Sequence, residues 1–228
     1  MTDTPLGPKL LVEAIGTFLL TFIGAGAIIS TQGNDLLVIA LAHGIVLAIA
    51  VTAAMNISGG MINPAVTIGM LVTRRISVKN GIAYIIAEVV GAVIAGYMLF
   101  AVYPSAMGNL VHWGTPTLGA STNVGQGILF EAIMTFILVF AVFGTAVDPR
   151  APKVGGFAIG LAVAVDIMAG GPFTGAAMNP ARAIGPAIAS GDFANWYVYW
   201  IGPIVGAIIA ALLYHYVIMK DHESGGWS

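Results

Sequence analysis

Six apolar segments dominate the sequence, and each is long enough to cross a lipid bilayer. A membrane-spanning helix needs about 20 predominantly apolar residues, and the hydropathy of this chain reaches that length six times. The fifth segment is the shortest of them. The pattern predicts membrane helices near residues 10–30, 36–56, 81–102, 126–147, 154–171 and 196–219.

Two shorter apolar runs follow the second and the fifth of these segments, and each opens with Asn-Pro-Ala. The two copies are Asn63-Pro64-Ala65 and Asn179-Pro180-Ala181. Asn is a favoured N-cap and Pro a favoured first helical residue, so each motif predicts a helix start. A helix over residues 63–73 would rise about 16 Å, roughly half of the hydrocarbon core. The sequence therefore predicts two half-helices that enter from opposite faces and meet at the midplane.

The positions of the basic residues support this arrangement. With six full spans and two re-entrant half-helices, every Lys and Arg except Arg182 falls on one side of the membrane. By the positive-inside rule that side is cytoplasmic, which places both termini there. We expect the protein in the cell membrane. The residues on the cytoplasmic side are Lys9, Arg74, Arg75, Lys79, Arg150, Lys153 and Lys220.

The two halves of the chain repeat each other. Glu13-Ala-Ile-Gly-Thr-Phe in the first segment matches Glu131-Ala-Ile-Met-Thr-Phe in the fourth. Three spans and a half-helix, repeated once, give a second copy of inverted orientation, and such repeats often surround a permeation path. We expect one transmembrane channel domain over residues 1–228, with repeat 1 at about 8–102 and repeat 2 at about 124–219.

The composition excludes several other classes. Hydrophobic residues make up 58% of the chain and charged residues only 8%, whereas about 25% is usual in globular domains. The net charge of −2 does not fit a nucleic-acid partner, and the absence of Cys excludes thiolate metal sites. The apolar spans offer no metal-ligand cluster and no Ser/His/Asp arrangement. We therefore expect no enzyme, no catalytic residue, no metal and no cofactor.

The paired Asn-Pro-Ala motifs, Ser58-Gly59-Gly60-Met61-Ile62-Asn63-Pro64-Ala65-Val66-Thr67 and the Glu-x-x-x-Thr-Phe segments resemble the aquaporin (major intrinsic protein) family. The resemblance covers nearly the whole chain. Met168-Ala169-Gly170-Gly171-Pro172-Phe173 resembles the tonoplast-intrinsic branch, while the short tails resemble a microbial member. The family implies an all-α membrane protein of six transmembrane helices plus two re-entrant half-helices in an inverted repeat, forming a right-handed bundle. It also implies a homotetramer with one pore per subunit.

The pore residues follow from this resemblance. Asn63 and Asn179 would cap the half-helices with their side-chain oxygens and leave their NH₂ groups free for passing water. The positive ends of the two half-helices would repel cations and protons at the same place. The constriction maps onto four residues, by distance from the Asn-Pro-Ala motifs. These selectivity-filter residues are His43, Ile167, Ala176 and Arg182.

Four acidic residues lie within the apolar segments. By resemblance, Glu13 and Glu131 are structural and accept N–H bonds from the loop before each half-helix. Glu88 and Asp166 stand where many members carry amides, and each could be protonated. Another interpretation makes all four a proton relay in a coupled transporter. His112, in the long outer loop, could approach the filter.

These observations favour a passive water channel in the lipid bilayer that excludes protons and ions. The filter implies that small neutral solutes such as ammonia, urea and hydrogen peroxide pass as well. The alternative is a facilitator whose main cargo is ammonia, urea or glycerol. Glycerol facilitators of the family carry Asp directly after the filter Arg, where this chain has Ala183, which argues against glycerol.

Overall fold

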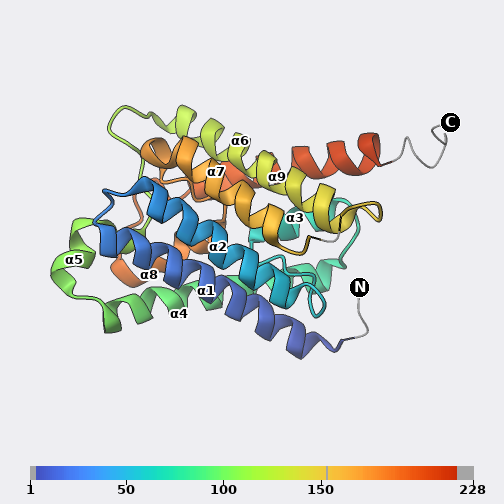
Figure 1. Cartoon of the computed structure of the whole chain (residues 1–228), viewed down its shortest axis with the longest axis horizontal. Helices are drawn as coiled ribbons and strands as arrows, with labels where there is room; N and C mark the ends of the chain where they lie inside the picture. The colour runs from blue at the N-terminus through green and yellow to red at the C-terminus, as the bar shows by residue number, and fades with distance from the viewer. Residues whose placement is uncertain (1–3, 153, 220–228) are drawn as a thin grey trace.

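The structure is a computed structural model that describes residues 4–152 and 154–219. Within these residues, six helices are long and apolar enough to cross a membrane, and they lie side by side in one bundle (Figure 1). The predicted class, an all-α membrane protein with six spans, is confirmed. The spans are α1 (Leu6–Thr31), α2 (Leu36–Ala54), α4 (Val78–Val102), α6 (Val124–Val142, extended by the π-helical turn Phe143–Val147), α7 (Phe157–Thr174) and α9 (Val198–Leu213, extended by Tyr214–Ile218).

Two short helices start at the Asn-Pro-Ala motifs, as predicted. Helix α3 (Pro64–Val72) has 9 residues and α8 (Pro180–Ser190) has 11. Asn63 Oδ1 accepts from Ala65 N at 2.8 Å, and Asn179 Oδ1 accepts from Ala181 N at 3.0 Å. The Pro at the first helical position needs no N–H partner, so each helix can begin deep inside the protein. Between α4 and α6 the chain adds α5 (Ser105–Leu110) and a 3₁₀ turn, His112–Gly114.

The two ends of the bundle differ. The end with Leu6 and Ile218, here called the terminal end, also holds the loops 73–77 and 148–156. The opposite end, here called the α5 end, holds α5 and the loop 191–197 (Figure 1). Helix α3 runs from the bundle centre toward the terminal end, and α8 runs toward the α5 end. Lys153 and Lys220 lie outside the described residues.

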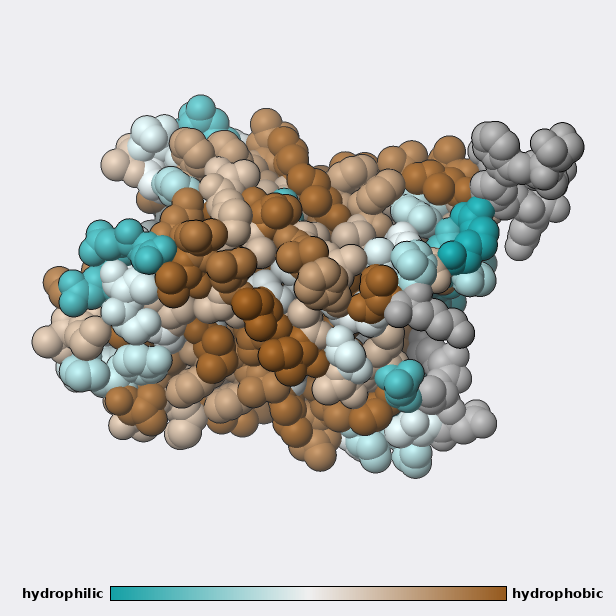
Figure 2. Space-filling model, in the orientation of Figure 1, coloured by the Kyte–Doolittle hydropathy of each residue, from teal (hydrophilic) through white to brown (hydrophobic). Residues whose placement is uncertain are grey.

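Apolar side chains cover the outside of the bundle and polar ones lie within it. In Figure 2 brown residues fill the middle of the visible face, and teal residues lie toward both ends. Leu11, Ile49 and Leu129 are exposed, whereas Glu13, Glu88 and Glu131 have no exposed surface. Lipid can solvate an apolar exterior but cannot pair polar groups, so this distribution is that of an integral, multi-pass membrane protein.

At the terminal end, a hydrogen-bonded group ties the loop after α6 to the last turns of α9. Arg150 Nε donates to Asp148 Oδ1 at 2.8 Å, and Tyr214 Oη donates to Asp148 Oδ2 at 3.5 Å. The hydrogen bonds from Arg150 lower the pKa of Asp148 to about 2. The Asp148 carboxylate is therefore ionised at any physiological pH, and this link does not titrate.

Glycines let equivalent helix pairs approach closely in both halves. A Cβ at Gly91 of α4 would lie 2.0 Å from the Ala14 carbonyl oxygen of α1. A Cβ at Gly206 of α9 would lie 2.0 Å from the Ala132 carbonyl oxygen of α6. Real Cβ atoms do not approach backbone oxygens so closely, so a side chain at either site requires the helices to separate.

We expect Gly206→Ala to lower the thermal unfolding midpoint in detergent, because the added methyl must displace backbone. Overpacking of this kind costs about 1–3 kcal/mol. Gly7→Ala is the matched control, since a Cβ at Gly7 would meet nothing within 4 Å. Equal midpoints for the two variants would contradict the packing described here.

Candidate functional site

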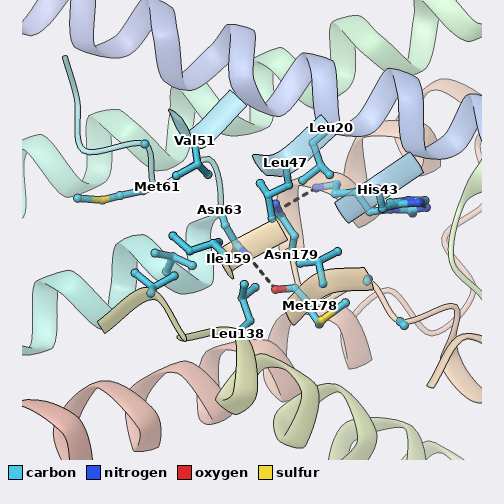
Figure 3. Close-up of a pocket in the computed structure, with 17 residues that line it drawn as sticks. Leu20, His43, Leu47, Val51, Met61, Asn63, Leu138, Ile159, Met178 and Asn179 are labelled. Atoms are coloured by element: carbon cyan, nitrogen blue, oxygen red, sulfur yellow. Dashed lines mark hydrogen bonds between the residues drawn. The ribbon is translucent and has the colours of Figure 1, made fainter. Parts of the chain in front are cut away.

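The two Asn residues at the centre of the bundle are cross-connected. Asn63 Nδ2 donates to the Met178 carbonyl oxygen at 2.9 Å (Figure 3), and Asn179 Nδ2 donates to the Ile62 carbonyl oxygen at 2.8 Å. We expected both protons of each Asn NH₂ group to be free, and this is wrong for one proton of each group, which the opposite loop binds. The second proton of each group remains, and both Asn residues line a cavity.

Buried carboxylates hold the loop before each half-helix. Glu13 accepts from Met61 N at 3.0 Å and from Ile62 N at 2.5 Å. Glu131 accepts from Ala177 N at 2.9 Å and from Met178 N at 2.7 Å. These N–H groups belong to buried loop residues outside any helix, so no intrahelical carbonyl accepts from them. The carboxylates thus satisfy donors that would otherwise be unpaired within the membrane.

The loops need this support because their backbone is strained. Ile62 has φ +52°, Ala176 has φ +46° and Met178 has φ +51°. This left-handed region is unfavourable for side chains other than Gly, especially for the β-branched Ile62. Tyrosines add further bonds, since Tyr84 Oη donates to the Ser58 carbonyl and Tyr199 Oη to the Thr174 carbonyl. The conformation of both loops is therefore fixed by buried side chains rather than by local preference.

A narrow cavity follows the line where the half-helices meet. It has a volume of about 20 Å³, which is room for single water-sized molecules. Its polar groups come from Asn63, Asn179, His43 and Arg182, and the rest of its wall is mostly apolar (Figure 3). A second cavity of about 350 Å³ shares Met61 with the first and opens toward the terminal end. The two cavities share several lining residues and therefore adjoin, and we refer to them together as the path.

Arg182 lies at the α5 side of the narrow cavity and is almost fully buried. Its Nη1 donates to the Gly114 carbonyl oxygen at 2.9 Å, and its Nη2 lies 3.2 Å from His43 Nε2. His43 Nδ1 lies 2.8 Å from the Ile39 carbonyl oxygen, so Nδ1 carries a proton and Nε2 accepts from Arg182. An uncharged imidazole and a carbonyl thus fix a guanidinium in the wall of the path.

Three of the four residues that we expect in the filter line the narrow cavity, and the place of Ile167 in the filter stays a prediction. His43, Ala176 and Arg182 line the narrow cavity. Ile167 is 2% exposed and belongs to the hydrophobic core, but it is not among the lining residues. Sequence reasoning also missed the Gly114 carbonyl, because a backbone oxygen has no signal in the sequence.

Glu88 and Asp166 lie away from both cavities. Glu88 Oε1 accepts from Thr67 Oγ1 at 2.7 Å, on the first turns of α3. Within the described residues, Glu88 Oε2 and Asp166 Oδ2 have no hydrogen-bond partner, and neither residue lines the narrow cavity or the wider one. Glu13 and Glu131 use their oxygens on the loops. The geometry therefore does not favour the proton relay.

Among the residues that the structure describes, no three His, Cys, Asp or Glu side chains lie together so that they could hold a metal ion. Comparison with known proteins points to one family. The family model described as Major intrinsic protein matches residues 3–214. Aquaporin TIP4-4 of Zea mays is 42% identical over 93% of this chain and 88% of its own length. Aquaporin-4 of Mus musculus is 40% identical over 92% of this chain and 67% of its own length.

Among solved structures, an aquaglyceroporin from Plasmodium falciparum has the same fold. The TM-score is 0.88, and the match covers 97% of this chain and 100% of the other. At 21% identity this similarity supports the fold alone. The sequence relatives and the family model support membership of the family independently.

Replacing Glu131 by Gln should destabilise the protein. A carboxamide has one acceptor oxygen, and its NH₂ group would face the Ala177 or the Met178 N–H. One buried donor left unpaired costs about 1–3 kcal/mol, so we expect a lower thermal midpoint in detergent.

Asp35→Asn is the matched carboxylate-to-amide control. Asp35 accepts from Val38 N at the exposed start of α2, and Asn caps a helix as well as Asp. An unchanged midpoint for Glu131→Gln would show that the carboxylate does not hold the loop.

Proposed function

The chain belongs to the major intrinsic protein family, and we propose that it is a passive transmembrane channel through which water crosses the bilayer. Like the other members of this family, it is a channel and not an enzyme. The observation that carries the proposal is the narrow cavity of about 20 Å³, lined by Asn63, Asn179, His43 and Arg182. The relatives named as aquaporins support water as the main cargo.

The lining explains how water could pass while ions are excluded. The remaining amide protons of Asn63 and Asn179 can donate to a water oxygen at the centre. Helices α3 and α8 both begin there, and their N-termini carry partial positive charge. The fixed charge of Arg182 adds to this field. Cations and protons are repelled, whereas neutral water exchanges its hydrogen bonds with successive donors along the wall.

The same wall supports a limited range of neutral solutes. We propose His43, Ile167, Ala176 and Arg182 as the filter, and three of them, His43, Ala176 and Arg182, line the narrow cavity. The small side chain of Ala176 leaves room that a larger residue would fill. Ammonia, urea and hydrogen peroxide are small neutral molecules that could use this room. Glycerol as the main cargo is not favoured, because Ala183 follows Arg182 in place of the Asp of glycerol facilitators.

We further propose a single channel domain over the whole chain, assembled as a homotetramer with both termini in the cytoplasm. Helices α2 and α7 present an apolar groove to the outside, lined by Leu41, Ile45, Ala48, Leu161 and others, which fits contact with another subunit or with lipid. The cell membrane remains our predicted location. Membrane fractionation of the native cell tests this location.

The function is tested by stopped-flow shrinkage of proteoliposomes under an impermeant osmolyte. We expect fast water efflux with low activation energy for the wild type and for His43→Phe. Entry of ammonia, followed with an internal pH dye, should fall in His43→Phe because Phe narrows the filter and removes the imidazole acceptor. A barrier raised by about 1.4 kcal/mol lowers this flux about tenfold.

Leu37→Phe is the matched control, since Leu37 lies on the same helix, is exposed on the outside and does not line the apolar groove. It should leave both fluxes unchanged. Water flux no faster than in empty liposomes would refute the water channel. Ammonia flux equal in His43→Phe and wild type would refute the filter assignment and leave the water channel standing.

A further inference from the structure

We propose that the hydrogen-bonded pair of His112 and Asp192 is a clip that positions the Arg182 guanidinium and thereby sets which neutral solutes pass. The effect on solutes rests on the channel function proposed above, but the positioning itself does not. Neither residue lines the narrow cavity. They are positioning residues, which act through the Gly114 carbonyl and through the end of α8.

The backbone that presents the Gly114 carbonyl is unusual. His112, Trp113 and Gly114 are three consecutive residues with positive φ, of +50°, +54° and +75°. Two of them carry side chains, for which this region is unfavourable. Such a conformation persists only where contacts on both sides of the segment hold it. The Gly114 oxygen is therefore placed by what its neighbours contact.

Trp113 holds the inner side of this segment. Its side chain is 4% exposed and stacks on Phe100 of α4, with ring centroids 3.7 Å apart. Its Nε1 donates to Asn109 Oδ1 at 2.8 Å. A Cβ at Gly108 would lie 2.5 Å from the indole ring, so the ring is closely enclosed. These contacts fix Trp113 but leave its neighbour His112 at the surface.

His112 and Asp192 hold the outer side. His112 Nδ1 lies 2.7 Å from Asp192 Oδ2, and Asp192 Oδ1 accepts from Ala194 N at 3.1 Å. The carboxylate is thus oriented before it meets the imidazole. Because Nδ1–H donates in both the neutral and the charged form of imidazole, the pair does not require a protonated His112.

The clip closes a ring that contains the filter residue. From His112 the ring passes along the backbone to Gly114, across the hydrogen bond to Arg182, along α8, and back through Asp192, which stands two residues beyond Ser190. Both sides of the Arg182–Gly114 bond are therefore tied by the same pair. Without it, Arg182 keeps the contact with His43 but its second anchor can shift.

This pair is too exposed to matter much for folding. The side chains of His112 and Asp192 are 57% and 26% exposed, and surface pairs contribute little to global stability. Breaking the pair should therefore alter the position of Arg182 while leaving the thermal midpoint nearly unchanged. A shifted Arg182 at an unchanged thermal midpoint therefore distinguishes a positioning role of the pair from a merely structural one.

The test measures urea and water permeability in the same proteoliposomes for His112→Ala, Asp192→Ala and the double variant. We expect the urea-to-water ratio to rise at least about threefold in each single variant. The double variant should show the same rise as each single one, because the two residues act as one unit. His112→Asn should keep the wild-type ratio, since its amide can donate from nearly the place of Nδ1.

Ser121→Ala is the control, an exposed change in the same loop. Additive effects, or a ratio in both single variants equal to wild type, would overturn the proposal. An experimental structure of His112→Ala provides a readout that does not depend on transport. We expect Arg182 Nη1 to lie beyond hydrogen-bond distance of the Gly114 oxygen, and an unchanged bond would overturn the clip even if the wild type conducted no water.

Discussion

Backbone N–H and C=O groups within the hydrocarbon must find partners inside the protein, because lipid offers none. A helix that begins at the midplane makes this demand acute, since its first N–H groups have no intrahelical acceptor. This chain begins two helices there. Asn63 and Asn179 cap the first turns, and Glu13 and Glu131 accept the N–H groups of the loops before them. The rest of the bundle supports these bonds.

The same bonds produce the chemistry of the path. The Asn side-chain oxygens accept hydrogen bonds from the first turns of the half-helices, and one proton of each amide donates to the opposite loop. Each amide is thereby oriented, so its remaining proton has a fixed direction. Fixed donors in a narrow cavity exchange bonds with a passing molecule without rearranging. The same Asn side chains therefore pair the backbone groups at the helix starts and direct hydrogen-bond donors into the cavity.

Arg182 shows how a charge is tolerated in this setting. Its guanidinium is always protonated and has five donors, and the protein supplies a carbonyl oxygen and an imidazole nitrogen as acceptors. Neither acceptor neutralises the charge. The positive field of Arg182 therefore remains effective in the wall, which fits a path for neutral molecules. A carboxylate partner at this point would stabilise Arg182 but would weaken the barrier to cations.

The six spans, the two half-helix starts and the charged residue in the cavity wall can all be predicted from the amino-acid sequence. Each follows from a local rule: apolar length for the spans, the Asn-Pro pair for the starts, and an isolated Arg182 among apolar residues for the wall. The fold adds that Ile167 is buried in the core and that Asn63 bonds to the loop before α8. It also brings the Gly114 carbonyl to Arg182, and His112 to Asp192. These contacts join segments far apart in the chain, and several use backbone oxygens. A backbone oxygen is the same at every residue, so its role is set by where packing places it.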